Sequence, residues 1–397
     1  MLTTASTTHE WQAVEAVMQR ALGRVFPTAV LLIQQRGHTV LHRAYGFLEP
    51  ETRQQPAGLD TLFDLASLTK LFTATAFMRL VEARKVALQE PVATVLPEFS
   101  GVRSLRSYAD PLHPGQEIAI VPSTREKVDA GQVTFWHLLT HTSGLPAWNP
   151  LFRLGSPRAA IEAVLASPFS YLPGTRVVYS DLGFILLGEA VSRLAGRPLD
   201  VALSELVLKP LHLEATHFRP LAVPIAATEF CAWRGRRLIG EVHDENAAGL
   251  GGIAGHAGLF ATAADLARLG EMYLCLARRR GWSSQDDGAE VGAGVAKLLR
   301  PGTVAKMTRL QAEDGVTRRG LGFALWSPDP EASGHPFGPL AFGHTGFTGT
   351  SLWIDPQREL LVACLTNRVY YGRDPQGITA FRVALHRAVV AASEGQR

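Results

Sequence analysis

Residues 62–74 read LFDLASLTKLFTA, an apolar run that leads into a predicted helix over residues 68–83. Ser67 and Lys70 lie three positions apart, so a helical backbone places the hydroxyl and the amine on the same face. A helix N-terminus favours negative charge that develops on the serine oxygen, and burial lowers the pKa of an amine. These are the requirements of a serine nucleophile with a lysine partner. On its own, the pair also fits a polar first turn of an ordinary helix.

Two further stretches place polar side chains beside predicted elements. Residues 179–181 read Tyr-Ser-Asp and lead into a predicted helix, and residues 344–346 read His-Thr-Gly and precede a predicted strand. Each stretch has a structural alternative, because Asp181 can cap a helix, Tyr179 can lie half-buried in a strand and His344 can occupy a strand edge. In isolation, the structural alternative is the simpler interpretation of each.

The two ends of the chain contain the same kinds of element. They are a helix over residues 11–22, which follows a capping box at Thr7 and Glu10, a β-hairpin over 29–45, a second hairpin over 350–366 and a final helix over 375–391. Consecutive hairpins imply an antiparallel sheet, and flanking helices imply that its faces are covered. Between the ends, helices are predicted over residues 68–83, 134–141, 157–165, 181–194 and 264–275, with loops over 100–132 and 281–294.

The order of the three polar stretches resembles that of the penicillin-recognising serine hydrolases, which include class C β-lactamases, DD-peptidases and β-lactamase-like esterases. Those proteins carry S-x-x-K, Y-x-N and [KH]-T-G in this order. Two more stretches are similar to family segments, HLLTHTSGL at residues 137–145 and AGLFATAADL at 257–266. The similarity extends from about residue 26 to residue 367, which is nearly the whole chain.

The resemblance implies an α/β fold of the α+β type, in which an antiparallel sheet flanked by the N- and C-terminal helices receives an inserted, mostly helical domain. The expected boundaries are residues 1–66 and 240–397 for the sheet domain and 67–239 for the helical domain. The active site is expected in the cleft between them.

The resemblance also implies roles for individual residues. Ser67 would attack a carbonyl carbon, with Lys70 and Tyr179 moving the proton, and either of these two could be the general base. The backbone N–H groups of Ser67 and Phe347 would form the oxyanion hole. The product is an acyl-enzyme that water releases, without a metal or an organic cofactor.

Two departures from the family pattern bear on the substrate. His344 stands where β-lactamases usually carry lysine, and a histidine is mostly neutral at pH 7, so it offers less charge to a substrate carboxylate. Asp181 replaces the usual asparagine, which disfavours an anionic acyl group and suits a neutral ester or a substrate that bears an amine. Thr345 and Gly346 complete the expected substrate-binding residues.

Three other patterns do not support the functions that they suggest at first sight, namely dinucleotide binding, metal binding and α/β-hydrolase catalysis. Residues 249–254 scan as a dinucleotide fingerprint, but no apolar strand precedes them, which favours a backbone turn. His243 and His256, with the acidic residues that follow His243, lack the spacing of a metal site, and we expect them at the rim of the cleft. The chain contains no G-x-S-x-G motif, so the α/β-hydrolase arrangement is not supported.

Composition sets the broad class. The chain has 397 residues, 46 % hydrophobic residues and a net charge of +3, and its 39 basic residues are scattered. This argues against nucleic-acid binding, which requires a basic stripe.

Residues 1–20 contain no apolar segment, so we expect no export signal, no membrane span and a cytoplasmic location. Three distant cysteines predict neither disulfides nor a zinc site. No feature of the sequence indicates whether the protein is a monomer or a homo-oligomer.

The sequence therefore favours a serine hydrolase that cleaves a small ester or amide through an acyl-enzyme. The first alternative is a DD-peptidase, a D-aminopeptidase or a weak class C-type β-lactamase. The second alternative is a non-catalytic protein that binds a small ligand, although the retention of Ser67, Lys70 and Tyr179 argues against it.

Overall fold

A computed structural model describes residues 11–110, 115–119, 127–220, 224–278, 298–374 and 376–395. An antiparallel sheet of eight strands lies in order β12-β13-β14-β15-β16-β17-β1-β2. The strands are β1 (Thr28–Gln35), β2 (His38–Gly46), β12 (Ala312–Asp314), β13 (Thr317–Arg319), β14 (Ala324–Leu325), β15 (Phe342–Thr345), β16 (Ser351–Asp355) and β17 (Leu360–Thr366). The sheet unites both ends of the chain, because β1 pairs with β17.

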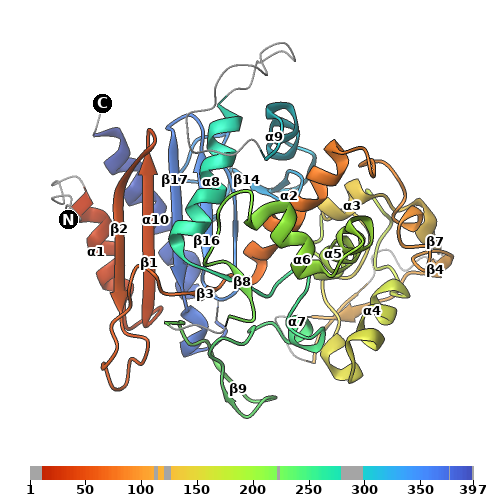
Figure 1. Cartoon of the computed structure of the whole chain (residues 1–397), viewed down its shortest axis with the longest axis horizontal. Helices are drawn as coiled ribbons and strands as arrows, with labels where there is room; N and C mark the ends of the chain where they lie inside the picture. The colour runs from red at the N-terminus through yellow and green to blue at the C-terminus, as the bar shows by residue number, and fades with distance from the viewer. Residues whose placement is uncertain are drawn as a thin grey trace.

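Both faces of the sheet are covered, as the hairpin pattern predicts. Along β1, Val30 belongs to the apolar cluster that includes α8 (Ala263–Ala277), whereas the next residue, Leu31, belongs to the cluster with α1 (Gln12–Ala21) and α10 (Gln376–Glu394). Figure 1 shows α8 across the front of the sheet and α10 behind it. Because successive side chains of a strand point to opposite faces, a strand buried on both faces is apolar throughout.

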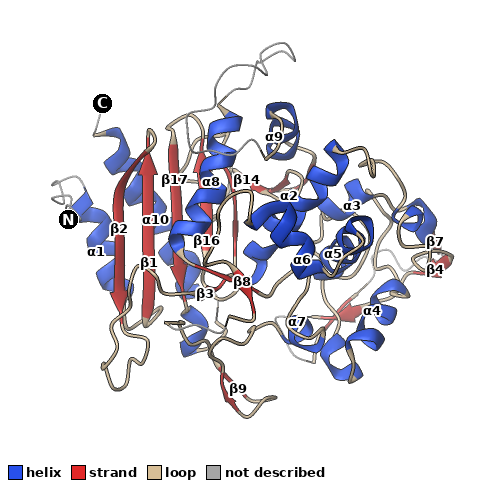
Figure 2. Ribbon diagram, viewed as in Figure 1, coloured by secondary structure: helices blue, strands red, loops and turns tan. Residues whose placement is uncertain are grey.

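Five further helices gather beyond one edge of the sheet (Figure 2). They are α2 (Thr69–Glu82), α3 (Phe135–Leu139), α4 (Pro157–Leu165), α5 (Asp181–Ala195) and α6 (Leu199–Leu203). Helix α5 has a clear start and stop: the Ser180 hydroxyl caps its first turn, and Gly196 ends it with a φ of 67°. Helix α2 is buried on nearly all sides and packs against α5.

These observations confirm the predicted end elements, the helices and the mixed α/β class. The predicted loop over residues 100–132 is wrong in part, because it contains β4 (Val102–Ser104) paired with β7 (Lys127–Asp129), and β5 (Tyr108–Ala109) paired with β6 (Glu117–Ile118). Strands of two or three mostly exposed residues are too short to show apolar alternation. The capping box at Thr7 and Glu10 and the loop over 281–294 lie outside the described residues.

Several short elements connect the sheet to the helices. A three-stranded sheet is formed by β3 (Phe63–Asp64), β11 (Leu259–Ala261) and β8 (His217–Phe218). Strands β9 (Phe230–Cys231) and β10 (Arg236–Arg237) make a protruding hairpin, and α7 (Glu245–Gly249) and α9 (Pro301–Thr308) complete the set. The domain boundaries at residues 66/67 and 239/240 stay a prediction.

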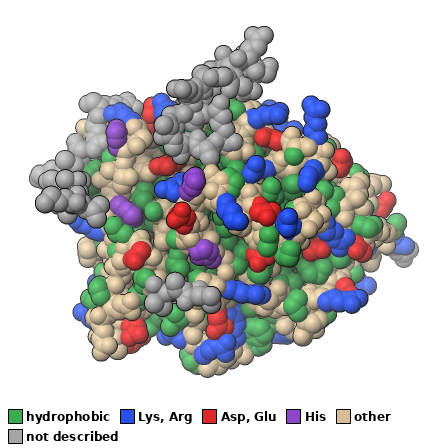
Figure 3. Space-filling model, in the orientation of Figure 1, with side chains coloured by type: hydrophobic (Ala, Val, Ile, Leu, Met, Phe, Trp, Pro, Cys, Tyr) green, Lys and Arg blue, Asp and Glu red, His purple; other side chains and the backbone are tan. Residues whose placement is uncertain are grey.

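The surface carries both signs of charge. Figure 3 shows basic and acidic side chains interspersed over one face of the molecule, without a continuous basic stripe on that face. Within the described ranges, no helix is both long enough and apolar enough to cross a lipid bilayer.

Candidate active site

Ser67 lies on a tight turn between β3 and α2. Residues 66–68 form one 3₁₀ turn, and Ala66 has a φ of 46°, a left-handed conformation that alanine rarely adopts. The buried Asp64 carboxylate stabilises this turn by accepting hydrogen bonds from the amides of Ala66, at 2.8 Å, and His243, at 2.6 Å. Strained residues of this kind concentrate at functional sites and persist only where their surroundings hold them. The turn fixes Ser67 at the N-terminus of α2.

The Lys70 side chain lies one turn further along and is fully buried. Its Nζ donates to Ser67 Oγ at 2.9 Å and to the carbonyl of His256 at 3.2 Å, and it lies 2.7 Å from Oδ1 of Asp181. The structure therefore confirms that the three-residue spacing brings the amine to the hydroxyl. It also shows that Asp181, from the first turn of α5, reaches the same amine.

The charge state of Lys70 differs from the expectation. Burial alone would lower the pKa of this amine, but its interactions with Asp181 and Tyr179 outweigh burial and raise the pKa above the ordinary lysine value. Burial lowers the pKa as expected, but Asp181, which occupies the position of the usual asparagine, and Tyr179 together reverse the net direction. Lys70 is thus an ammonium group at neutral pH.

Tyr179 faces this ammonium group. Its ring centroid is 4.8 Å from Lys70 Nζ and 5.3 Å from the guanidinium carbon of Arg319. The hydroxyl is buried and interacts with Lys70 and Ser67, which both favour its ionised form. Burial raises the pKa of Tyr179, and the charge of Lys70 opposes this shift. A buried hydroxyl beside Ser67 and Lys70 is placed to exchange a proton with Ser67 or with a substrate.

His141 holds Tyr179 in place from both sides. Its carbonyl accepts a hydrogen bond from the amide of Val178 at 3.0 Å, and its Nδ1 accepts one from the amide of Ser180 at 3.1 Å. The imidazole ring lies 4.5 Å from the Tyr179 ring. Burial and the charges of Arg319 and Lys70 hold the pKa of His141 well below its usual value, so Nδ1 stays an acceptor. His141 has a φ of 58°, a left-handed backbone conformation that most other side chains would strain.

We expect His141→Ala to lower kcat by about 100-fold, because displacing a catalytic group by about 1 Å costs that much. His141→Asn should retain more of the activity, since asparagine tolerates a left-handed backbone and offers an acceptor near the Ser180 amide. The measurement is kcat and KM over a pH series for both variants. If His141→Ala keeps its kcat and its pH profile, the residue does not position Tyr179.

The end of β15 closes the opposite side of the site. Thr348 Oγ1 donates to the carbonyl of Asp64 at 2.7 Å, and Thr350 Oγ1 donates to that of Leu65 at 3.0 Å. These bonds dock residues 346–350 against the chain just before Ser67. A Cβ atom on Gly346 would lie 2.5 Å from the Leu65 carbonyl, so glycine is needed there for close approach.

Two backbone amides flank this docking contact, at Ser67 and at Phe347. The N–H groups of Ser67 and Phe347 have no acceptor among the described residues, as an oxyanion hole requires. Arg368 fixes the turn, because its Nε donates to the Phe347 carbonyl at 2.8 Å and its guanidinium carbon lies 4.4 Å from the ring centroid. The His243 ring stacks against the same phenyl ring at 5.7 Å.

His344 and Thr345 lie on the strand that leads to this turn. The His344 ring is 5.8 Å from that of Tyr179, and burial, with the charges of Lys70 and Arg319, lowers the pKa of His344 to about 3. His344 is therefore neutral at pH 7, as its ordinary pKa predicts, and the lowered pKa keeps it neutral in mildly acidic solution as well. Thr345 lines a pocket of about 310 Å³ together with Arg319.

The two histidines predicted at the rim are instead buried beneath the site. His256 contributes its carbonyl to Lys70, and its ring Nε2 lies 2.9 Å from Asp244 Oδ1. Burial alone would raise the pKa of Asp244, but His256 outweighs it and holds that pKa below the ordinary value. His243 donates its amide to Asp64, and its ring lies 3.3 Å from Glu229. Their backbone roles explain why neither ring reaches the surface.

Asp181, Asp244 and His256 bring ligand-type atoms within 4.8 Å of one another, which is close enough to hold a metal ion. The Lys70 ammonium, however, is already 2.7 Å from Asp181 and supplies the positive charge that this carboxylate requires. These three side chains therefore form the electrostatic surroundings of Lys70.

A contact between two glycines allows His256 to reach Lys70. A Cβ atom on Gly188 of α5 would lie 2.8 Å from the Cα of Gly255, and one on Gly255 would lie 2.2 Å from the Phe184 carbonyl. Neither position has room for a side chain. The carbonyl of Gly255 accepts from Thr73 of α2 at 2.8 Å, which fixes this loop against the nucleophile helix.

Sequence reasoning assigned no role to Arg319, His141 or Asp244. Arg319 is one arginine among many and belongs to none of the stretches that resemble the family. His141 lies in the HLLTHTSGL stretch, so its place in a shared motif was the available signal. Asp244 was visible only as part of a polar run. Their tertiary contacts, not their sequence neighbours, bring them to Lys70 and Tyr179.

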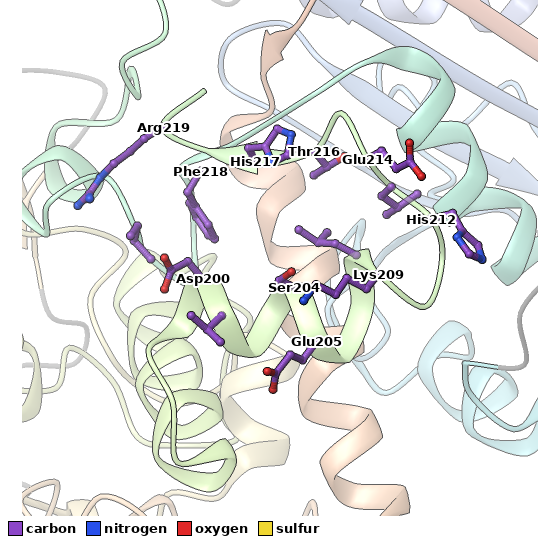
Figure 4. Close-up of a pocket in the computed structure, with 14 residues that line it drawn as sticks. Asp200, Ser204, Glu205, Lys209, His212, Glu214, Thr216, His217, Phe218 and Arg219 are labelled. Carbon is purple, nitrogen blue, oxygen red and sulfur yellow. The ribbon is translucent and has the colours of Figure 1, made fainter. Parts of the chain in front are cut away.

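A second pocket lies away from this site, between α6 and β8, with a volume of about 750 Å³. Its lining mixes acidic and basic side chains, among them Glu205, Lys209 and Glu214 (Figure 4). None of the predicted site residues lines it. Size alone does not make it the active site, because no nucleophile with an activating partner faces it.

Comparisons with known proteins identify the family. A sequence model of the family described as Beta-lactamase matches residues 12–386. The chain belongs to the beta-lactamase family. This beta-lactamase-family chain is 32 % identical to the N-acetylmuramyl-L-alanine amidase of Bacillus subtilis (strain 168), covering 91 % of this chain and 82 % of the relative. It is 30 % identical to a putative D-alanyl-D-alanine carboxypeptidase of Salmonella agona (strain SL483), covering 93 % and 86 % of the two chains.

Among solved structures, the beta-lactamase-family fold is shared with EstCE1, a hydrolase with promiscuous acyltransferase activity. The TM-score is 0.68 at 23 % sequence identity, and the match covers 94 % of this chain and 98 % of the other. The likeness confirms the expected fold. Family membership makes the protein a serine hydrolase that works through an acyl-enzyme.

Proposed function

We propose that this protein is a serine amidase in which Ser67 attacks the amide carbonyl of an acylated amino acid or peptide. The observation that carries the proposal is the contact of 2.9 Å between Lys70 Nζ and Ser67 Oγ, at the start of α2 and beneath the ring of Tyr179. The same three groups fit the requirement for a nucleophile, a fixed positive charge and a proton carrier.

The hydrogen bonds favour Tyr179 as the proton carrier. Lys70 is an ammonium group and donates to Ser67 Oγ, so the serine must direct its own proton elsewhere. The phenolate form of Tyr179 is the available proton acceptor. Burial disfavours this form, whereas the charge of Lys70 and the hydrogen bonds with Lys70 and Ser67 favour it. Asp181 contributes indirectly, because it keeps Lys70 charged.

The proposed reaction proceeds in two balanced steps. The reactive form contains Tyr179 as a phenolate beside the Lys70 ammonium group. As the Ser67 Oγ–carbon bond forms, the serine proton passes to the phenolate oxygen of Tyr179, and the carbonyl oxygen becomes an anion that the amides of Ser67 and Phe347 stabilise. Tyr179 then protonates the nitrogen as the carbon–nitrogen bond breaks, which releases the amine. Water attacks the acyl-enzyme in the same manner, releases the acid and restores Ser67.

The leaving group lies on the side of Tyr179 that also holds Arg319. We define the arginine pocket by Arg319, Thr345, Trp353 and Arg382, which line the cavity of about 310 Å³. Nε of both arginines and Nε1 of the tryptophan have no acceptor among the described residues. Burial lowers the pKa of Arg382 to about 10, so it is still a cation at neutral pH. Unpartnered cationic donors favour a carboxylate in this pocket.

This chemistry favours substrates whose leaving amine carries a carboxylate. Both relatives above are named for such amides, one for the bond between N-acetylmuramic acid and L-alanine and one for the D-alanyl-D-alanine bond. We therefore propose muramyl or D-alanyl peptides as the substrate class, with N-acetylmuramyl-L-alanine as the simplest member.

The test compares amides with a short ester. We expect the wild type to cleave N-acetylmuramyl-L-alanine or an acyl-D-alanyl-D-alanine. Arg319→Gln should lower kcat/KM for these amides by about 10- to 100-fold, as expected for a lost charge-assisted hydrogen bond, and leave p-nitrophenyl acetate nearly unaffected. Arg193→Gln is the matched control, because its guanidinium pairs with Glu98 at 2.8 Å and it does not line this pocket.

Other outcomes point to the alternatives. Turnover of p-nitrophenyl acetate with no amide cleavage would favour an esterase, and hydrolysis of nitrocefin would favour a weak β-lactamase. Intact-mass spectrometry after exposure to a fluorophosphonate provides an independent check. Absence of an adduct with any substrate or inhibitor would favour a non-catalytic binding protein and would overturn the proposal.

A further inference from the structure

Three aromatic side chains form a cluster outside the catalytic residues. The ring centroids of Trp148 and Phe152 are 6.4 Å apart, and those of Phe152 and Trp233 are 4.9 Å apart at a steep interplanar angle. Trp233 is 52 % exposed, although a tryptophan with so much apolar surface normally packs inside a protein. We call Trp148, Phe152 and Trp233 the aromatic wall. Exposed apolar surface of this kind marks an interaction site.

The aromatic wall is bonded to the active site through its neighbours in the chain. The carbonyl of Ala147, next to Trp148, accepts a hydrogen bond from the amide of Asp181 at 3.0 Å. The amide of Phe152 donates to the buried Asn246 side chain at 3.1 Å, two residues beyond Asp244. The wall is thus held directly beside the residues that surround Lys70.

A third bond ties the β9–β10 turn to the same region. Arg234, which follows Trp233, donates through Nη1 to the carbonyl of Val242 at 2.7 Å. The next residue, His243, stacks on Phe347 of the candidate oxyanion turn. The position of Trp233 is therefore set by the site and not only by its own hairpin.

The residues bonded to the aromatic wall indicate which half of the substrate the wall contacts. Tyr179 returns its proton to the leaving amine, and this amine lies toward Arg319 and His344. The wall is bonded instead to Asp181, Asn246 and Val242, and none of these three bonds involves Arg319 or His344. The acyl half of the substrate consequently faces the aromatic wall.

We infer that the aromatic wall binds the sugar ring of an N-acetylmuramyl acyl group. This inference rests on the proposed function and specifies the acyl half of its substrate. The C–H face of a pyranose is apolar and carries a small positive charge, which complements the negative face of an aromatic ring. The guanidinium groups of Arg153 and Arg234, whose central carbons lie 5.5 and 5.2 Å from the ring centroids of Phe152 and Trp233, supply polar surroundings suited to sugar hydroxyls.

The experiment uses two substrates with the same scissile bond and leaving group, N-acetylmuramyl-L-alanine and (R)-lactoyl-L-alanine, which lacks the sugar. Trp233→Ala should lower kcat/KM for the muramyl substrate by about 5- to 10-fold, within the range of one aromatic contact, and leave the lactoyl substrate unchanged within about twofold. Trp233→Phe should restore most of the loss. Phe230→Ala is the matched control, since Phe230 is 61 % exposed on the same hairpin and makes no ring contact with the wall among the described residues.

The two proposals fail in distinguishable ways. If the wild type cleaves both substrates equally well, or if Trp233→Ala slows both equally, the sugar subsite is overturned and the amidase stands. If the wild type cleaves neither, the amidase proposal fails. Titration of tryptophan fluorescence with N-acetylmuramic acid then decides about the wall: saturable quenching that is lost in Trp233→Ala supports the subsite, and its absence in the wild type overturns it.

Discussion

Ser67→Ala is expected to abolish the fluorophosphonate adduct and to lower kcat by about 10⁴-fold or more. Removal of a nucleophile costs this much because the remaining groups act only through it. The Ser67 hydroxyl accepts from Lys70, so its loss leaves one ammonium hydrogen-bond donor without that partner, while Asp181 and the His256 carbonyl still hold the amine. The fold should therefore survive the substitution.

The matched control for this prediction is Ser351→Ala. Its hydroxyl is also buried and makes no hydrogen bond among the described residues, so its removal should leave both the adduct and kcat unchanged. Intact mass and kcat are measured for the wild type and both variants. An adduct that persists in Ser67→Ala would place the nucleophile elsewhere in the chain.

Tyr179→Phe is expected to lower kcat by about 10²- to 10⁴-fold, the usual contribution of a positioned acid–base group. The substitution is specific, since a phenyl ring keeps the contacts with His141 and Lys70, and the lost hydroxyl interacts with the catalytic groups Lys70 and Ser67. Thermal unfolding should accordingly show a Tm no lower than that of the wild type. The measurements are kcat, KM and Tm.

The adduct separates this role from a structural one. Tyr179→Phe still contains Ser67 and Lys70, so it should react with the fluorophosphonate, more slowly than the wild type. Unchanged kcat in Tyr179→Phe would instead assign proton transfer to Lys70, and would require the Lys70 pKa to fall when substrate excludes water. A lowered Tm together with lost activity would show that the hydroxyl matters for stability.

Much of the fold could be predicted because its elements carry local signals. The hairpin of β1 and β2 shows apolar runs around a turn, and helix α5 begins after a serine cap and ends at Gly196. The proximity of Ser67 and Lys70 follows from helical geometry alone. The position of Tyr179 came only from the family resemblance, because 112 residues separate it from Ser67.

The charge state of Lys70 could not be predicted in the same way. It depends on the distance from Asp181, which the packing of α5 against α2 determines. Arg319 escaped prediction for a similar reason: the pairing of β13 within the sheet brings it to Tyr179, and no local pattern distinguishes it from the other arginines. The short strands between residues 102 and 129 carry no periodic signal at all.

The contact between Gly188 and Gly255 has a consequence for how this chain can vary. Neither glycine touches the reacting atoms, yet each leaves no room for even a methyl group where α5 meets the loop that carries His256. Substitution at either position must push that loop away from Lys70, so selection for activity constrains these two glycines as tightly as the nucleophile helix itself. A library of random variants, sorted by activity, should therefore be depleted of changes at positions 188 and 255, whereas changes at Gly302, which has open space and no left-handed backbone, should be tolerated.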